Sequence, residues 1–197
     1  MAKDLSVVIP AYNSEKTIFQ CINSVVSECE TNNLDYEIII VDDGSTDSTS
    51  FIIAEICKTN KNIVYIKQEN AGPSKARNNG ILHSTGKLIA FNDSDDGWTK
   101  GRLKYQLDFL SANPEADLVT SIYGSSTRGN NPFKISYKNM LFHNCYVTQT
   151  SVMKTKVAKN VLFPEDMIYS EDMRFVLKIM KYYNCFYLPK TFYTVFQ

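Results

Sequence analysis

The sequence lacks several features that would place it in a broad class of proteins. Its 197 residues carry 21 basic and 21 acidic side chains, so the formal net charge is zero, and binding of nucleic acid through a basic face is not expected. No apolar run approaches the ~20 residues that a membrane-spanning helix needs. The first residues include an acid, Asp4, where a signal peptide has a basic lead and then a long apolar stretch, so export is not expected.

Cysteine is present but forms no recognisable framework. The five cysteines are odd in number and include no Cys-x-x-Cys pair, which argues against a zinc ribbon and against a set of disulfides. Because a free cysteine behaves as a small hydrophobic residue, we expect reduced, buried thiols in a cytoplasmic protein.

Three motifs of common nucleotide-binding and hydrolytic enzymes are also missing. No Gly-x-Gly-x-x-Gly follows the first expected strand, so a dinucleotide cofactor is not expected. The sequence has no phosphate loop that ends in Gly-Lys-Ser or Gly-Lys-Thr. It also has no Gly-x-Ser-x-Gly nucleophile turn.

What the sequence does contain is a regular alternation of strands and helices. Apolar residues make up 44% of the chain, which is enough to form a core. Short apolar runs predict strands at 5–9, 36–41, 63–66 and 88–91, and helical patterns follow the first three. Strands and helices that alternate at this spacing indicate an α/β fold with a doubly wound, mostly parallel sheet flanked by helices.

The expected helix boundaries depend on local signals. Asn13 or Ser14 is expected to cap the first helix, and Phe19 is expected on its apolar face with several aliphatic residues. The second helix is expected to begin near Ser45, and the third is expected to run from Gly72 to about residue 82.

The second half of the chain is less regular. We expect a helix that ends before residue 113, a strand at 118–122, a loop over 124–132, a strand at 147–153, a helix at 171–183 and a strand at 191–196. Because the chain stops at Gln197, straight after the last expected strand, we expect a C-terminal segment to be missing.

Polar clusters follow three of the expected strands. The ligand crevice of a doubly wound sheet lies beyond the carboxyl ends of its strands, so these clusters are expected to open onto one edge. They are Pro10, Ala11, Tyr12 and Asn13 after the first strand, Asp42 and Asp43 after the second, and Asp93, Ser94 and Asp95 after the fourth.

Asp93 and Asp95 are the sharpest chemical signal among these clusters. Carboxylates two positions apart at a strand end can converge on a hard divalent ion such as Mg²⁺ or Mn²⁺. The same residues also suit an ordinary acidic turn. Asp42 and Asp43 leave a similar choice, because an acid in this position can accept a ribose hydroxyl or a base N–H, or can cap the next helix.

Two further charged pairs allow a functional and an ordinary interpretation. Lys75 and Arg77 lie near the start of the third helix, where cations are unfavourable unless a phosphate is bound nearby. The alternative is a pair of solvated bases. Glu171 and Asp172 begin the last long helix, where acids are favoured by the helix dipole. The functional alternative is a general base held over the crevice.

Five short motifs, taken in order, resemble a known family. The motifs are Val-Val-Ile-Pro-Ala-Tyr-Asn at 7–13, Ile-Val-Asp-Asp-Gly-Ser-Thr-Asp at 40–47, Asn-Ala-Gly at 70–72 with Ala-Arg-Asn at 76–78, Phe-Asn-Asp-Ser-Asp-Asp at 91–96, and Glu-Asp at 171–172. With these motifs the sequence resembles family 2 glycosyltransferases of the inverting, GT-A type, strongly to about residue 119 and weakly over 124–164.

The resemblance implies a role for each matching residue. Asp93 and Asp95 match the ends of the Asp-x-Asp motif and would hold the metal, with the first acid on the ribose side and the last bound to the ion. Asp172 matches the catalytic base. The residues that would bind the nucleotide-sugar are Pro10, Ala11, Tyr12, Asn13, Asp42, Asp43, Lys75 or Arg77, Asp93, Ser94 and Asp95.

The resemblance also implies a reaction and its partners. It implies a single catalytic domain over 1–197, with a nucleotide-sugar-binding part at about 1–98 and an acceptor-side part at about 99–197. A sugar would pass from a nucleotide-sugar donor, preferably a UDP-sugar, to a hydroxyl of a saccharide or lipid-linked saccharide, with Mn²⁺ or Mg²⁺ on the diphosphate. We expect a role in bacterial surface polysaccharide synthesis at the cytoplasmic face of a membrane, with peripheral association through the missing C-terminal segment.

Two other functions are alternatives to a glycosyltransferase. A nucleotide-binding module without transfer activity, acting inside a larger assembly, is favoured by the abrupt end of the chain. A sugar-phosphate nucleotidyltransferase would be expected to carry a glycine-rich, basic loop after the first strand, and residues 10–13 do not form such a loop.

Overall fold

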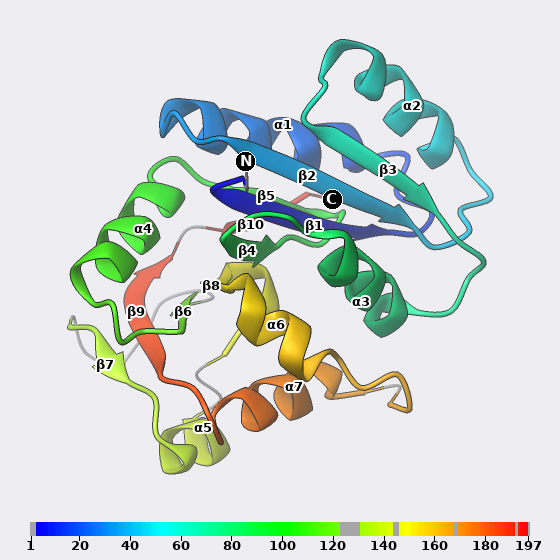
Figure 1. Ribbon diagram of the computed structural model, residues 1–197. Helices are drawn as coiled ribbons and strands as arrows, with labels where there is room; N and C mark the ends of the chain where they lie inside the picture. The colour runs from blue at the N-terminus through cyan, green and yellow to red at the C-terminus, as the bar shows by residue number, and fades with distance from the viewer. Residues whose placement is uncertain (1–2, 123–130, 144–145, 168, 192, 197) are drawn as a thin grey trace.

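The computed structural model describes residues 3–122, 131–143, 146–167, 169–191 and 193–196. Within these ranges, eight strands form one large sheet (Figure 1). In spatial order they are β3 (Ile63–Lys67), β2 (Tyr36–Asp42), β1 (Leu5–Ala11), β4 (Leu88–Phe91), β8 (Ser151–Lys154), β6 (Leu118–Ile122), β9 (Cys185–Thr191) and β7 (Phe133–Lys134).

Most strands of this sheet run in the same direction. The first four strands in the spatial order are parallel neighbours, and β6 and β9 are also parallel. β8 runs against β4 and β6, and β7 runs against β9. The mostly parallel sheet expected from the sequence is therefore confirmed, and the parallel strands place their carboxyl ends along one edge.

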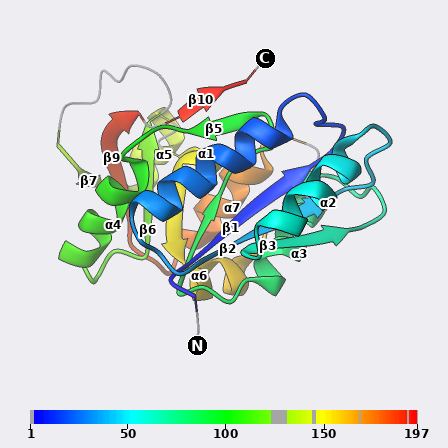
Figure 2. The same cartoon turned by 90° about the horizontal axis from the view of Figure 1, so that it is seen from above.

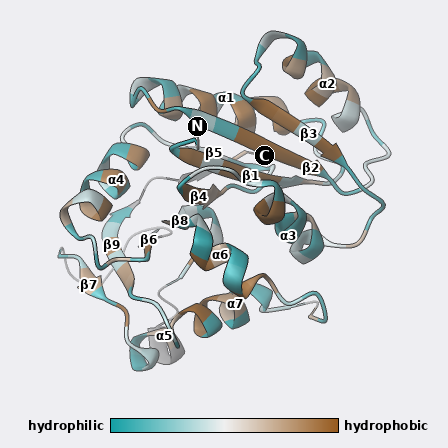
Figure 3. Ribbon diagram, in the orientation of Figure 1, coloured by the Kyte–Doolittle hydropathy of each residue, from teal (hydrophilic) through white to brown (hydrophobic). Residues whose placement is uncertain are grey.

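Helices cover both faces of the sheet (Figures 1 and 2). Val7 and Ile9 of β1 belong to a core cluster that includes residues of α1, α2 and α4, whereas Val8 and Phe91 pack with α3, α6 and α7 on the other face. Figure 3 shows the apolar strands between polar outer helix faces. The helices are α1 (Ile18–Thr31), α2 (Thr49–Thr59), α3 (Pro73–His83), α4 (Arg102–Ala112), α5 (Tyr137–His143), α6 (Thr155–Val161) and α7 (Glu171–Ile179).

A second, smaller sheet lies beside the main one. It consists of β5 (Asp96–Trp98) and β10 (Tyr193–Val195), which pair in antiparallel fashion. β5 comes directly after the acidic turn that follows β4, and β10 comes from the other end of the chain (Figure 2). The chain therefore returns at its C-terminal end to the turn at 93–95.

The four strands expected in the first half are confirmed. β1 runs further than the expected 5–9 and includes Pro10, which has no N–H to donate. This is tolerated because β4 has already ended opposite Val8, so only β2 still pairs with this part of β1.

The expected starts of the first two helices are wrong. α1 begins at Ile18, and Ser14 contributes its carbonyl to a preceding turn, where it accepts the N–H groups of Thr17 and Ile18. Phe19 points outward and is 56% exposed, so its place on the apolar face is also wrong. α2 begins at Thr49, because the N–H of Ser45 is held in a separate turn.

The second half shows both agreement and difference. α4 and β6 lie where they were expected. The strand expected at 147–153 is a short 3₁₀ turn, Thr148–Thr150, followed by β8, and α7 ends at Ile179 rather than at 183. Most of the loop expected at 124–132 and one of the five cysteines, Cys145, lie outside the described residues. No described helix is both long enough and apolar enough to cross a membrane.

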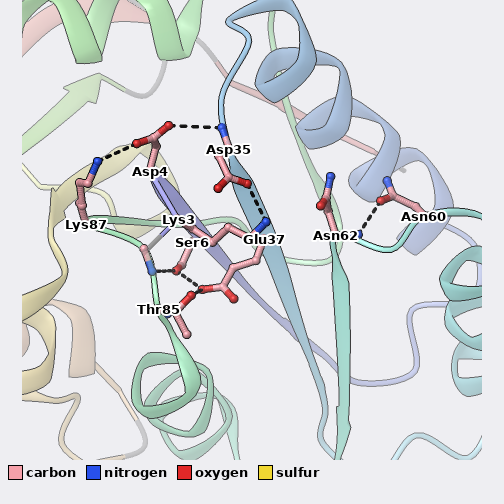
Figure 4. A network of polar contacts seen from close by, with 10 residues as sticks. Lys3, Asp4, Ser6, Asp35, Glu37, Asn60, Asn62, Thr85 and Lys87 are labelled. Carbon is pink, nitrogen blue, oxygen red and sulfur yellow. Dashed lines mark hydrogen bonds and ion pairs between the residues drawn. The ribbon is translucent and has the colours of Figure 1, made fainter. Parts of the chain in front are cut away.

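The amino ends of the parallel strands carry a compact polar network (Figure 4). Glu37 of β2 is buried, and one oxygen of its carboxylate accepts the Ser6 hydroxyl at 2.5 Å and the Thr85 N–H at 2.6 Å. The Ser6 oxygen in turn accepts the Gly86 N–H at 2.8 Å. These bonds join β1, β2 and the turn before β4 at the edge of the sheet away from the acidic turns.

Candidate functional site

A pocket of about 440 Å³ lies at the carboxyl ends of β1, β2 and β4. The three polar clusters expected at one edge of the sheet meet here, together with the start of α3. The lining residues are Pro10, Ala11, Tyr12, Asp43, Asn70, Gly72, Pro73, Ala76, Arg77, Asp93, Ser94 and Asp95.

The segment after β1 forms one wall of this pocket. Tyr12 is half exposed, and the backbone turns sharply at Asn13, which has a positive φ of 49°. The Asn13 Oδ1 accepts the Thr46 N–H at 2.9 Å, which favours this turn. Asn13 does not line the first pocket but lines an adjacent one of about 430 Å³, which Tyr12, Ser94 and Asp95 also border.

Asp43 holds the loop that leads into α3. Its carboxylate is only 4% exposed and accepts the N–H groups of Ala71 and Gly72 at 2.9 and 2.8 Å and the Gln68 amide at 2.7 Å. An acid at the first turn of a helix is favoured by the helix dipole. Asp43 therefore lines the pocket while it also orders the wall that α3 presents.

Asp42 has a different position from its neighbour. It is fully buried, does not line the pocket, and accepts the Ser45 N–H together with the hydroxyls of Ser50 and Tyr65. Burial alone would raise the pKa of Asp42, but hydrogen bonds from Ser45 and Ser50 outweigh it and lower the pKa. The expectation that Asp42 contacts the nucleotide is not supported by this geometry, because its carboxylate is taken up by the turn before α2.

Of the two bases on α3, only Arg77 reaches the pocket. It is 7% exposed, and its guanidinium lies 2.7 Å from Asp93 and 3.5 Å from Glu171. Burial alone would lower the pKa of Arg77, and the charge of Asp93 raises it. Lys75 is exposed to solvent and does not line the pocket.

Asp93 and Asp95 differ in their surroundings. Both oxygens of Asp93 are engaged, one by Arg77 and the other by the Gln149 amide at 2.5 Å. Asp95 is exposed, borders both pockets, and has no hydrogen-bonding or ionic partner for its carboxylate among the described residues. Of the two acids, Asp95 is therefore the one free to meet a ligand.

Asp172 lies at the start of α7, next to Glu171, which contacts the pocket residue Arg77. Its neighbour Glu171 is linked to Asp93 through Arg77. The Asp172 carboxylate accepts the Met173 N–H at 2.6 Å and is partly exposed. The acidic start of α7 and the Asp-x-Asp turn thus lie on the same side of the molecule.

A family model described as Glycosyl transferase family 2 matches residues 6–180. The chain belongs to glycosyltransferase family 2. The resemblance seen in the five motifs is thereby confirmed, and so is the α/β fold that it implied.

Individual relatives agree with the family. The chain is 36% identical over 176 residues to an uncharacterized glycosyltransferase of Rickettsia conorii, a match that covers 85% of this chain and 28% of that protein. It is 31% identical over 187 residues to the Escherichia coli UDP-Glc:alpha-D-GlcNAc-diphosphoundecaprenol beta-1,3-glucosyltransferase WfgD, covering 90% of this chain and 70% of that protein.

A solved structure extends the comparison to three dimensions. The crystal structure of residues 1–349 of Staphylococcus aureus TarS in complex with UDP superposes with a TM-score of 0.79 and 26% identity, covering 98% of this chain and 60% of that one. The chain spans between a quarter and a third of the length of the curated Rickettsia relatives that it matches.

Two residues of this family 2 site were missed by sequence reasoning. Gln149 binds Asp93 from the 3₁₀ turn before β8, and a lone glutamine in an expected strand carries no signal of that contact. Asn70 belongs to the Asn-Ala-Gly motif at 70–72 and lines the pocket beside Asp43, a position that the motif alone did not indicate. Only the folded chain shows that Glu171, rather than Asp172, faces Arg77.

Proposed function

We propose that the chain is the nucleotide-sugar-binding and catalytic part of an inverting glycosyltransferase that uses a UDP-sugar. The observation that carries the proposal is the pocket at 10–12, 43, 77 and 93–95, which combines an apolar wall with a buried cation and a free carboxylate. A nucleoside diphosphate suits such a pocket. Its base and ribose can pack against the apolar wall and accept or donate hydrogen bonds, and its phosphates are stabilised by positive charge.

The relatives support the same donor class. TarS has been crystallised with UDP and with UDP-GlcNAc, and WfgD is named for a UDP-glucose donor. In this chain the nucleotide would lie against Tyr12 and Asp43, and its diphosphate would point toward Arg77 and Asp95. Arg77 is already paired with two acids, so its charge is partly neutralised before a diphosphate arrives.

The residues of the pocket fit a divalent cation in one position. The free carboxylate of Asp95 is an oxygen ligand of the kind that Mg²⁺ and Mn²⁺ prefer. No group of three potential ligands lies together among the described residues, which suits an ion held by one or two carboxylates and by substrate phosphates. When bound, such an ion would stabilise the negative charge of the leaving diphosphate.

Asp93 is less suited to direct contact with the ion. Both of its oxygens accept bonds from Arg77 and Gln149. We therefore propose that Asp95 is the metal ligand and that Asp93 fixes Arg77 beneath the diphosphate. Asp95 therefore keeps the metal-binding role that the Asp-x-Asp motif implied, whereas Asp93 is given the role of positioning Arg77 instead.

We assign the general base to Asp172. A carboxylate that removes the proton from the acceptor hydroxyl as the hydroxyl attacks the sugar gives a single displacement, which inverts the anomeric centre. Such help is typically worth 10²–10⁴-fold in rate. Partial exposure at the start of α7 keeps Asp172 accessible to an acceptor. The proposed acceptor is a saccharide or lipid-linked saccharide in bacterial surface polysaccharide synthesis at the cytoplasmic face of a membrane.

Two substitutions test this proposal. Asp95→Ala should remove the Mn²⁺-dependent part of UDP binding, whereas Asp172→Asn should leave that binding intact and lower transfer by ~10²–10⁴-fold. Calorimetry with UDP, with Mn²⁺ or with EDTA, measures the first effect, and release of UDP from a panel of UDP-sugars with acceptor extract measures the second. Equal Mn²⁺-dependent affinity in all three proteins would remove Asp95 as the metal ligand. UDP binding without release of UDP from any donor would instead favour the nucleotide-binding module.

A further inference from the structure

The small sheet of β5 and β10 holds the turn that carries Asp95. β10 comprises Tyr193–Val195, beyond residue 180, where the match to the family model ends. It pairs with β5 over three residue pairs, Tyr193 with Trp98, Thr194 with Gly97 and Val195 with Asp96. The pairing therefore reaches the residue next to Asp95.

One more hydrogen bond extends this pairing to Asp95 itself. The backbone N–H of Phe196 donates to the carbonyl of Asp95 over 2.8 Å. The Phe196 side chain also packs against the larger core cluster, which contains residues of β1, β2 and α1. The backbone of Asp95 is thus tied through Phe196 to the core.

The Phe196 ring lies directly on the backbone of Gly97. A Cβ atom at position 97 would be 2.5 and 2.8 Å from two ring carbons and 3.1 Å from the Thr194 Cγ2. Real Cβ atoms essentially never come within 3.0 Å of such atoms. Only glycine allows the ring to lie this close, so the packing of the C-terminal residues Thr194 and Phe196 depends on glycine at position 97.

The inner side of the same turn is held by different groups. The buried Asn92 side chain donates to the Asp96 carbonyl at 2.9 Å, and the Cys21 thiol donates to the Asp93 carbonyl at 3.4 Å. These bonds fix residues 93 and 96 but not 95. Phe196, directly after β10, therefore supplies the backbone bond at the residue whose carboxylate is free to meet a ligand.

We propose that β10 is a positioning element for Asp95, and that contact between Phe196 and Gly97 sets where the Asp95 carboxylate enters the pocket. This inference rests on the proposed function, because it takes Asp95 as the metal ligand. Asp95 has no side-chain partner among the described residues, so its position depends on its backbone. A small shift of that backbone moves the carboxylate relative to the diphosphate.

The test is a double-mutant cycle read out by UDP binding. Gly97→Ala should displace the Phe196 ring and weaken UDP binding in the presence of Mn²⁺ by roughly tenfold or more, since loss of a group that orients a metal ligand typically costs about 10–100-fold in metal affinity. UDP binding in EDTA should be unchanged, because the remaining pocket residues are untouched. Phe196→Ala should weaken the Mn²⁺-dependent binding similarly, and adding Gly97→Ala to it should cause no further loss, because the clash is gone.

Val195→Ala provides the matched control, because Val195 is the neighbour of Phe196 in the chain, is 45% exposed and keeps its backbone pairing with β5 in the variant. It should bind UDP as the wild type does. A variant that is only less stable lowers the melting temperature but keeps its ratio of Mn²⁺ to EDTA affinities. If Gly97→Ala does not fold, the comparison of Phe196→Ala with Val195→Ala makes the same test.

The outcomes separate the two proposals. A wild-type protein that does not bind UDP with Mn²⁺ would overturn the proposed function. A wild-type protein that binds, alongside folded Gly97→Ala and Phe196→Ala variants with the same ratio of Mn²⁺ to EDTA affinities, would overturn the positioning role of β10 and leave the proposed function standing.

Discussion

The two edges of the parallel strands use their carboxylates in opposite ways. At the amino edge, Glu37 is enclosed by donors from Ser6 and Thr85, and no pocket described here reaches it (Figure 4). At the carboxyl edge, Asp93 is also engaged, but it lies beside Asp95, whose carboxylate is free and borders two pockets. Both edges carry an acid engaged by hydrogen bonds, Glu37 and Asp93, so such bonds alone do not mark a functional site.

The edges also differ in how charge is balanced. Within the part of the chain that the structure describes, the hydrogen-bond donors to Glu37 are neutral hydroxyl and backbone groups. Asp93 and Glu171 share the cation Arg77, which is itself buried. A buried ion pair often contributes no more to stability than apolar side chains of similar volume would. Stability alone therefore does not explain why a cation lies between these two acids, and a functional role is favoured. The difference between the edges can be tested by substitutions on each side.

The largest effect is expected from Arg77→Met. This change leaves Asp93 and Glu171 without their shared cation in a mostly buried position, and breaking such a pair typically costs about 3–5 kcal/mol. Urea denaturation should therefore show a large drop in the free energy of unfolding. UDP binding should weaken as well, because the pocket loses its positive charge.

The matched control is at the opposite edge of the sheet. Lys87 pairs with Asp4 across 3.0 Å, but these side chains are 69% and 46% exposed. Lys87→Met should cost less than about 1 kcal/mol, because an exposed ion pair contributes little. Equal losses in Arg77→Met and Lys87→Met would contradict the claim that the buried ion pairs of Arg77 contribute more to stability than the exposed pair of Lys87 and Asp4.

The first half of the fold could be predicted because its signals are local. β1 and β2 are mostly apolar segments that are buried along their whole length, and such segments indicate strands of a parallel sheet covered on both faces. The order of polar clusters after those strands also placed the pocket correctly, since parallel strands bring their carboxyl ends together. The pocket therefore followed from sequence order alone.

The rest of the site depends on contacts between residues far apart in sequence. Gln149 is 56 positions from Asp93, and Arg77 is 94 positions from Glu171. No periodic pattern reports such pairs. The predicted starts of the first two helices were wrong for a related reason. The side chain of Asn13 accepts a hydrogen bond from Thr46 instead of capping the first helix, and the Ser45 N–H donates to Asp42 in a separate turn instead of joining the second helix. Tertiary hydrogen bonds competed with the local capping preference and prevailed.

A moderate effect is expected from Gly86→Ala at the amino edge. A Cβ atom there would lie 2.6 Å from the Ser6 nitrogen and 2.8 Å from the Leu5 carbonyl carbon. Backbone atoms cannot move aside as a side chain can, so overpacking should cost about 1–3 kcal/mol of unfolding free energy. The affinity for UDP should be unchanged, because the pocket is at the other edge.

Thr85→Ala serves as the comparison for Gly86→Ala. It removes only the 3.0 Å bond from the Thr85 hydroxyl to Glu37, which is worth about 1 kcal/mol. Urea denaturation of both variants, with UDP calorimetry, measures the two quantities. A fully folded Gly86→Ala variant that binds UDP more weakly than the wild type would show that the two edges are coupled. That result would contradict the expectation that the amino edge affects stability alone.

The smallest effect concerns Asp42, which belongs to the carboxyl edge in sequence but resembles Glu37 in its enclosure. The pKa of Asp42 is lowered from its ordinary 3.8, with hydrogen bonds from Ser45 and Ser50 outweighing the opposing effect of burial. A folded pKa below the unfolded one means that the ionised carboxylate stabilises the fold above about pH 4, and that this contribution is lost as the pH falls through the folded pKa. Asp42→Asn should therefore be less stable than the wild type by about 1 kcal/mol at pH 7, and the difference should shrink below about pH 4.

Urea denaturation between pH 7 and pH 3 measures this narrowing. Asp108→Asn removes the same charge from an exposed position on α4, where the carboxylate contacts Lys104, and separates the effect of local bonds from that of net charge. A difference between the wild type and Asp42→Asn that stays constant down to pH 3 would mean that the Asp42 carboxylate does not stabilise the turn before α2. If Asp42→Asn also keeps the UDP affinity of the wild type, Asp42 belongs with Glu37 as a structural acid, and the free carboxylate of Asp95 is what distinguishes the carboxyl edge.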